Sequence, residues 1–180
     1  GNMLPTACSV IQPFVHLAVS ISSYYEMEQL NILIKMATTS LKTRTYTVIM
    51  SLAGDALPSF TDLPDPFRHS DFDIRDVNDA YQKKMTDLVR ILRLHAERGD
   101  RVILYSRDGM LSIVAMVAYM CATNEELSVE DALANILNAR YPTKSMGKQV
   151  TAYVKELLDP RQFDEYLRAL STWVDAYRAA

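Results

Sequence analysis

A strand, a short loop and an apolar helix follow one another directly in the stretch RVILYSRDGMLSIVAMVAYM, residues 101–120. Val102–Tyr105 is typical of a buried strand, and Met110–Asn124 carries no charged residue. This uncharged run is shorter than the ~20 residues of a membrane span, so we expect a core helix. The helix N-terminus after such a loop leaves unpaired N–H groups that suit an anion, and Gly109 lets the backbone curl. Most strand-to-helix turns of this kind bind nothing, so both interpretations stay open.

Strand-like and helix-like patterns alternate along the chain without an internal repeat, which predicts an α/β domain. Three prolines within 55–66 predict a loop, and Gly99 predicts the end of a helix. Ser128 and Asp131 form a capping-box pattern at the start of another helix. The expected strands are 10–18, 46–52 and 102–105, and the expected helices are 26–36, 78–97, 110–124, 128–139, 150–157 and a last helix from Pro160 with Asp159 as its cap.

Charge and cysteine content exclude several classes of protein. The 180 residues carry 19 Lys and Arg against 22 Asp and Glu, and the basic residues are scattered, so we expect no nucleic acid partner. The two cysteines are too few for a disulfide framework or a zinc site, which indicates a reducing compartment, the cytoplasm. We therefore expect no metal, no cofactor and no membrane partner.

Several segments follow the order and spacing of one family. They include Ile11–Leu17, Tyr46–Leu52, Phe72–Asp76, residues 101–112 and the pieces between 118 and 142. Together they resemble the dual-specificity subgroup of the protein tyrosine phosphatases, from about Val10 to Leu158, with only the last helix outside the resemblance. The resemblance implies a three-layer α/β fold, with a central mixed sheet flanked by helices and an extra C-terminal helix. We expect a phosphatase-like domain over residues 1–158 and a helical extension, residues 159–180, packed on it.

The family signature His-Cys-x-x-Gly-x-x-Arg falls on residues 101–112, and this chain departs from it. In the family's register Tyr105 stands for the His, Ser106 for the nucleophilic Cys and Ser112 for the phosphate-gripping Arg, while Gly109 is retained. Ile113 follows where the family usually has a Ser or Thr. The resemblance therefore implies a phosphate loop made of Ser106, Arg107, Asp108, Gly109, Met110, Leu111 and Ser112.

Serine at position 106 changes what the loop can catalyse. A Cys at a helix N-terminus has a pKa lowered to roughly 3.5–7.5 and attacks as the thiolate, whereas a serine hydroxyl needs an adjacent base. Tyr105 replaces the nearest candidate base, and we interpret His95 as a capping or surface residue. Loss of the nucleophile costs a hydrolase about a millionfold in turnover, so ordinary cysteine-phosphatase catalysis is excluded.

The loop also has a weakened grip on phosphate. Ser112 cannot reproduce the two-pronged hydrogen bonding of an Arg. Asp108 brings a negative charge that opposes a dianion unless Arg107 neutralises it, and active family members also carry Arg there. Met110 and Leu111 are candidates to fill the pocket.

The family's general acid precedes its nucleophile by roughly thirty positions. In this register Asp76 is our first candidate for the acid position and Asp73 the second. Both are equally well interpreted as solvated loop carboxylates. Without a phosphoenzyme to form, neither has a leaving group to protonate.

These patterns predict a catalytically inactive phosphatase-like domain, a pseudophosphatase, that acts as a binding or scaffolding module. In one version the pocket still binds a phosphorylated Tyr, Thr or Ser on a protein partner. In the other, which we favour, the pocket is closed and partners bind elsewhere. The alternative is an active protein phosphatase with atypical chemistry, in which Asp76, Asp108 or Ser106 does the work of the Cys. The oligomeric state is left open.

Overall fold

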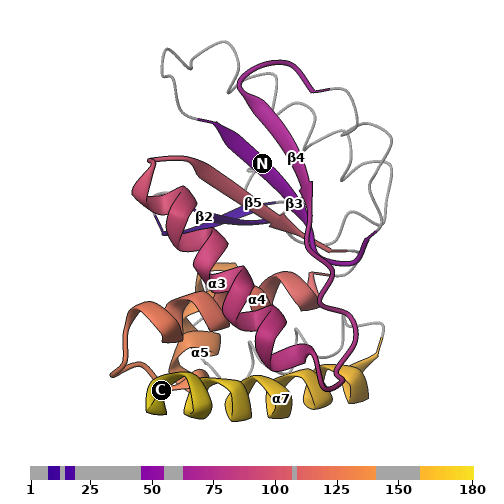
Figure 1. The fold of residues 1–180 in the computed structure, drawn as a ribbon, viewed down its shortest axis with the longest axis vertical. Coiled ribbons are helices and arrows are strands. Elements are labelled where there is room, and N and C mark those ends of the chain that lie inside the picture. The colour runs from indigo at the N-terminus through magenta and orange to yellow at the C-terminus, as the bar shows by residue number, and fades with distance from the viewer. Residues whose placement is uncertain (1–7, 13–14, 19–45, 55–62, 107–108, 141–158) are drawn as a thin grey trace.

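A mixed five-stranded sheet organises the described part of the molecule (Figure 1). The computed structural model describes residues 8–12, 15–18, 46–54, 63–106, 109–140 and 159–180. The strand order is β1-β2-β5-β3-β4, in which β1 and β2 are antiparallel and all other neighbours are parallel. The strands span β1 Cys8–Gln12, β2 Val15–Ala18, β3 Thr47–Ser51, β4 Phe67–Asp71 and β5 Arg101–Tyr105.

The strands β3, β4 and β5 end together at one edge of the sheet. The register aligns Ser51 of β3 with Tyr105 of β5 on one side and with Asp71 of β4 on the other. The segments that follow these strands therefore emerge side by side. Ligand sites in open parallel sheets lie outside this carboxyl edge, so these three segments frame the candidate site.

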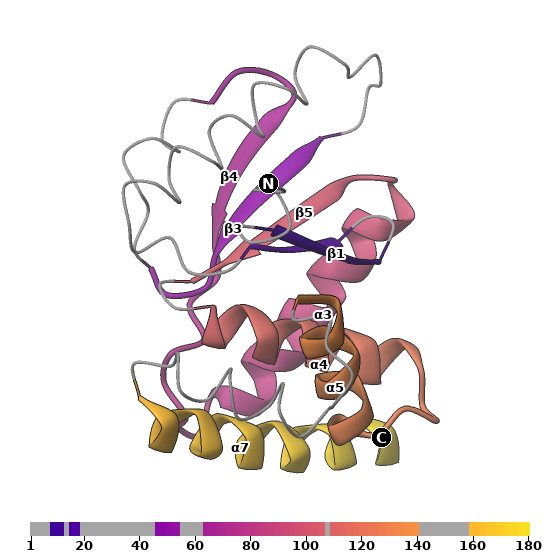
Figure 2. The same ribbon diagram turned by 180° about the vertical axis from the view of Figure 1, so that it is seen from behind.

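Four helices in the described residues pack on one side of the sheet, with α7 furthest from the strands (Figures 1 and 2). The central helix, α4, is buried from Met110 to Ala122 and contacts α3, α5 and α7. A helix that is apolar all round belongs in such a position. None of the described helices is long and apolar enough to cross a membrane. The helices span α3 Tyr81–Glu97, α4 Met110–Thr123, α5 Val129–Arg140 and α7 Pro160–Ala179.

The central strand β5 is buried on both faces. Val102 and Leu104 belong to the core shared with the helices, and Ile103 and Tyr105, on the other face, are buried as well. Burial on both faces is typical of a central parallel strand and explains the continuous apolar run at this position. The strand, the core helix and the α/β class predicted from the sequence are confirmed.

Most predicted helix ends are confirmed where the structure describes them, but α3 begins at Tyr81 rather than at Asn78. Ser128 Oγ accepts a hydrogen bond from the N–H of Asp131 at 3.0 Å and caps α5. Asp159 Oδ1 accepts one from the N–H of Gln162 at 3.1 Å and caps α7. Gly99 takes a φ of +77°, the left-handed conformation that ends α3. The predicted helices 26–36 and 150–157, and any layer on the far face of the sheet, lie outside the described residues.

Two strand predictions need correction. The run 10–18 predicts one strand, but the structure divides it into β1 and β2, which pair antiparallel. The resemblance places a strand within Phe72–Asp76, whereas β4 ends at Asp71 and the whole of that segment is a loop. Among the strands that the structure describes, β4 pairs with β3 alone, and only Phe67 in it is buried. An edge strand of this kind lacks the apolar alternation that reveals strands in a sequence.

Helix α7 packs against α3 and α4 on the side away from the sheet (Figure 1). Its stripe of buried side chains follows the helical spacing, since apolar residues recur every three or four positions. The indole N–H of Trp173 donates to Thr86 Oγ1 of α3 at 3.1 Å. The buried residues of α7 are Phe163, Tyr166, Leu170, Trp173 and Val174.

Candidate functional site

Ser106 lies directly after β5, at the carboxyl edge of the sheet. It is buried, and Gly109, with a φ of +84°, forms the N-cap of α4 three residues later. Only a residue without a Cβ adopts this conformation freely, so Gly109 serves the tight turn that the sequence predicts. Arg107 and Asp108 lie outside the described residues.

The hydroxyl groups of Ser106 and Ser112 are hydrogen-bonded to each other. Their Oγ atoms are 3.1 Å apart, and the N–H of Ser112 also donates to Ser106 Oγ at 3.3 Å. The two residues are 3% and 0% exposed. The two residues that the sequence resemblance assigns to the nucleophile and the phosphate clamp thus lie side by side, and their polar groups bond to each other.

No histidine or carboxylate among the described residues bonds to the Ser106 hydroxyl. His95 Nδ1 instead lies 3.0 Å from Asp100 Oδ2, and Asp100 also accepts from the N–H of Tyr46. Asp100 precedes the start of β5 and Ser106 follows its end, a separation of roughly 20 Å along the strand. His95 thus lies in the last turn of α3, paired with Asp100 and remote from Ser106, in agreement with its interpretation as a capping residue.

Tyr105, at the position of the family's His, has a partner that the sequence did not reveal. Its hydroxyl is 3.0 Å from Nε2 of His69 on β4, and the same nitrogen is 3.8 Å from Asp71. The hydroxyl of Ser51, on the intervening strand, is buried and has no hydrogen-bond partner among the described residues. These residues form a polar cluster at the carboxyl ends of β3, β4 and β5.

The two candidate acid residues lie in the loop after β4, and they differ in their surroundings. Asp73 accepts hydrogen bonds from the backbone N–H, Nε and Nη2 of Arg75, at 3.0, 3.0 and 2.8 Å. The Arg75 guanidinium lowers the pKa of the Asp73 carboxyl below its usual value. A general acid must instead hold its proton until it donates it. Asp76 is exposed.

Met110 and Leu111 belong to the hydrophobic core at the start of α4, where both are buried. Among the described residues, no group of three or more His, Cys, Asp or Glu side chains could hold a metal ion. The described residues of the loop therefore offer a ligand two hydroxyl groups, backbone N–H groups and apolar side chains.

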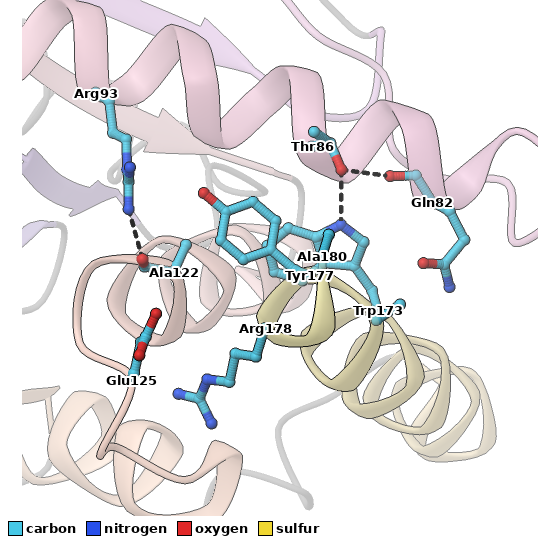
Figure 3. Close-up of a pocket in the computed structure, with 10 residues that line it drawn as sticks. Gln82, Thr86, Arg93, Ala122, Glu125, Trp173, Tyr177, Arg178 and Ala180 are labelled. Atoms are coloured by element: carbon cyan, nitrogen blue, oxygen red, sulfur yellow. Dashed lines mark hydrogen bonds between the residues drawn. The ribbon is translucent and has the colours of Figure 1, made fainter.

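A pocket of about 490 Å³ lies at the other end of α4 (Figure 3). The rings of Trp173 and Tyr177, with centroids 5.0 Å apart, form part of its lining. Arg93 and Arg178 border it and donate to backbone carbonyls where α4 ends. A helix of 14 residues is roughly 21 Å long, so this pocket is remote from Ser106.

No protein-family profile and no curated protein matches this sequence. Solved structures do match. PTPMT1 gives a TM-score of 0.60 at 13% identity, covering 96% of each chain. A mouse putative dual-specificity phosphatase, solved with zinc tungstate, gives 0.55 at 12% identity and covers 98% of this chain and 95% of that one.

A third match is the human tyrosine phosphatase-like serine/threonine/tyrosine-interacting protein, with a TM-score of 0.52 at 19% identity, covering 82% of this chain and 95% of that one. This chain therefore has the fold of the dual-specificity phosphatases. Identities this low establish the fold and leave the activity to the residues of the site. Because α7 holds 20 of the 180 residues, a match to 98% of the chain extends into α7, beyond the Leu158 limit of the sequence resemblance.

Proposed function

We propose that this protein is a catalytically inactive module with a phosphatase fold that binds a protein partner. The observation that carries the proposal is the hydrogen bond between the buried hydroxyl groups of Ser106 and Ser112. These residues stand where the fold's active members, by the sequence resemblance, have the attacking thiolate and the arginine fork.

The catalytic part of the proposal follows from the surroundings of Ser106. A serine becomes a nucleophile only when a neighbouring base takes its proton, and the described partners of Ser106 are the hydroxyl and the N–H of Ser112. Loss of a hydrolase nucleophile costs about a millionfold in turnover. A site with neither thiolate nor base is expected to fall at least this far below a working phosphatase.

The binding part of the proposal favours the closed version of the loop. A phosphate that enters must displace the Ser106 hydroxyl from the Ser112 N–H, one of the donors that an anion would use. It gains no arginine in return, and each charge-assisted hydrogen bond contributes about 1.5–3 kcal/mol. Partner proteins would then bind elsewhere on the surface.

Two further observations support a protein-binding role in the cytoplasm. The human phosphatase-like protein with the same fold is named for its interaction with serine, threonine or tyrosine. Cys121 is a free, buried thiol, which suits a reducing compartment.

The purified protein is expected to hydrolyse p-nitrophenyl phosphate no faster than buffer, because Ser106 has no base. The Ser106→Ala variant, which keeps the backbone and removes the hydroxyl, should give the same rate. A rate clearly above buffer that Ser106→Ala abolishes would instead establish an active phosphatase with atypical chemistry.

A further inference from the structure

The segment from Phe72 to Asp76 is tied to the body of the protein at several points. Two of its N–H groups donate to the end of β3 and the residue that follows it: Phe72 to the carbonyl of Ser51 at 2.8 Å, and Ile74 to that of Leu52 at 3.0 Å. The Ile74 side chain is 0% exposed and belongs to the main core. The first half of the segment is thus held by two backbone hydrogen bonds and one buried side chain.

An internal ion pair shapes the middle of the segment. Arg75 folds back on Asp73, and the two charged groups lie against Gly54 in the loop after β3. A Cβ atom at Gly54 would lie 3.2 Å from Nη2 of Arg75, and Gly54 has a φ of +72°. The ion pair therefore packs against a backbone surface that only glycine provides easily.

The last anchor comes from α7, at the far end of the sequence. The hydroxyl of Tyr166 donates to the carbonyl of Arg75, and Gln162 Nε2 donates to the same hydroxyl at 3.2 Å. Tyr166 is 1% exposed. Burial and the nearby Asp76 carboxylate raise the pKa of Tyr166 to about 12, so the hydroxyl remains a donor at neutral pH.

We infer that α7 acts as an internal strap, in which Tyr166 holds the segment 72–76 in one position against the sheet edge. Asp73 is occupied by Arg75, and the backbone next to Asp76 is fixed by Tyr166, so the segment is not free to move its carboxylates toward a phosphate ester over Ser106. The inference rests on the proposed function, because it adds the loss of a usable general acid to the loss of the nucleophile and of the phosphate clamp. Tyr166 is thus a positioning residue.

Hydrogen exchange of the wild-type protein and of Tyr166→Phe tests the strap. The N–H groups of Phe72, Ile74 and Arg75 are all hydrogen-bonded, so they report opening of the segment. The Phe variant keeps the buried ring and removes the hydroxyl, which loses the bond to the Arg75 carbonyl along with the one from Gln162. Loss of the bond to Arg75 should make a peptide covering 72–76 exchange about three to ten times faster. The control is Trp173→Phe, which removes a hydrogen bond from the same helix to α3 and should leave that peptide unchanged.

Two outcomes overturn the strap: unchanged exchange in Tyr166→Phe, or equal acceleration in Trp173→Phe, which would mean general loosening of α7. Turnover of p-nitrophenyl phosphate by the same wild-type sample is measured separately. A phosphatase-active protein with a slowly exchanging segment would overturn the proposed function and leave the strap standing. An inactive protein with a freely exchanging segment would overturn the strap and leave the proposed function standing.

Discussion

The double variant Ser106→Cys/Ser112→Arg is expected to hydrolyse p-nitrophenyl phosphate about 10²- to 10⁴-fold faster than the wild-type protein. Restoring a nucleophile recovers about 10⁶ in turnover, and a missing general acid forfeits about 10²–10⁴ of it. The recovery is incomplete because Asp73 is paired with Arg75 and the segment is held by Tyr166. The rate should be lower still for phenyl phosphate, because its leaving group is more basic than p-nitrophenolate and depends more on the missing acid.

The matched control is Ser106→Ala/Ser112→Arg, which has the restored fork without a nucleophile and should stay at the wild-type rate. Ser112 is 0% exposed, so circular dichroism must first establish that both variants fold. A folded double variant with no turnover would mean that the loop no longer has the geometry of a phosphate site. Equal rates for phenyl and p-nitrophenyl phosphate would show that a working acid survives.

Trp173→Ala is expected to lower the free energy of unfolding by about 3–5 kcal/mol, the usual cost of removing a large buried aromatic side chain. Trp173 is 1% exposed, packs against the tilted ring of Tyr177 and donates a hydrogen bond to Thr86 of α3. Stabilities of single domains are about 5–15 kcal/mol, so the loss is a large fraction of the total. The measurement is urea denaturation followed by circular dichroism, since the chain has 1 Trp and the variant loses its fluorophore.

The control for this variant is Trp173→Phe, which keeps an aromatic ring in the core and loses the hydrogen bond to Thr86. The Phe variant should lower the free energy of unfolding by clearly less than the Ala variant does. If Trp173→Ala costs under about 1 kcal/mol, α7 would be a loosely attached addition. A loss of about 3–5 kcal/mol in the free energy of unfolding would show that α7 stabilises the same domain as α3 and α4.

The parts of the fold that the sequence predicts are those with a continuous apolar run or a helical period of apolar residues. β5 and α4 are apolar on all sides because they lie at the centre, and their pattern is therefore unmistakable. β4 escapes prediction because its sequence, FRHSD, has one buried residue. Its strand character comes from backbone pairing with β3, which the side-chain pattern does not record.

The candidate site likewise has features that the sequence predicts and features that it does not. Resemblance to a family signature assigns Ser106, Gly109 and Ser112 to one phosphate loop, whereas the structure places Ser112 in the first turn of α4. It did not predict that the two serines bond to each other, because an Oγ to Oγ distance depends on the path of the backbone. Contacts between distant segments were also missed: Tyr105 meets His69 across 36 positions and Tyr166 meets Arg75 across 91. Only the folded chain brings such pairs together.

The central claim is that Ser106 and Ser112 close the loop by bonding to each other, and a crystal structure of the wild-type protein grown with tungstate tests it most directly. Tungstate is a suitable probe, since it was present in the mouse phosphatase that shares this fold. We predict that the loop holds no oxyanion and that the two Oγ atoms stay near the 3.1 Å separation seen here. Tungstate held by the loop N–H groups, with the two hydroxyl groups parted, would contradict the claim.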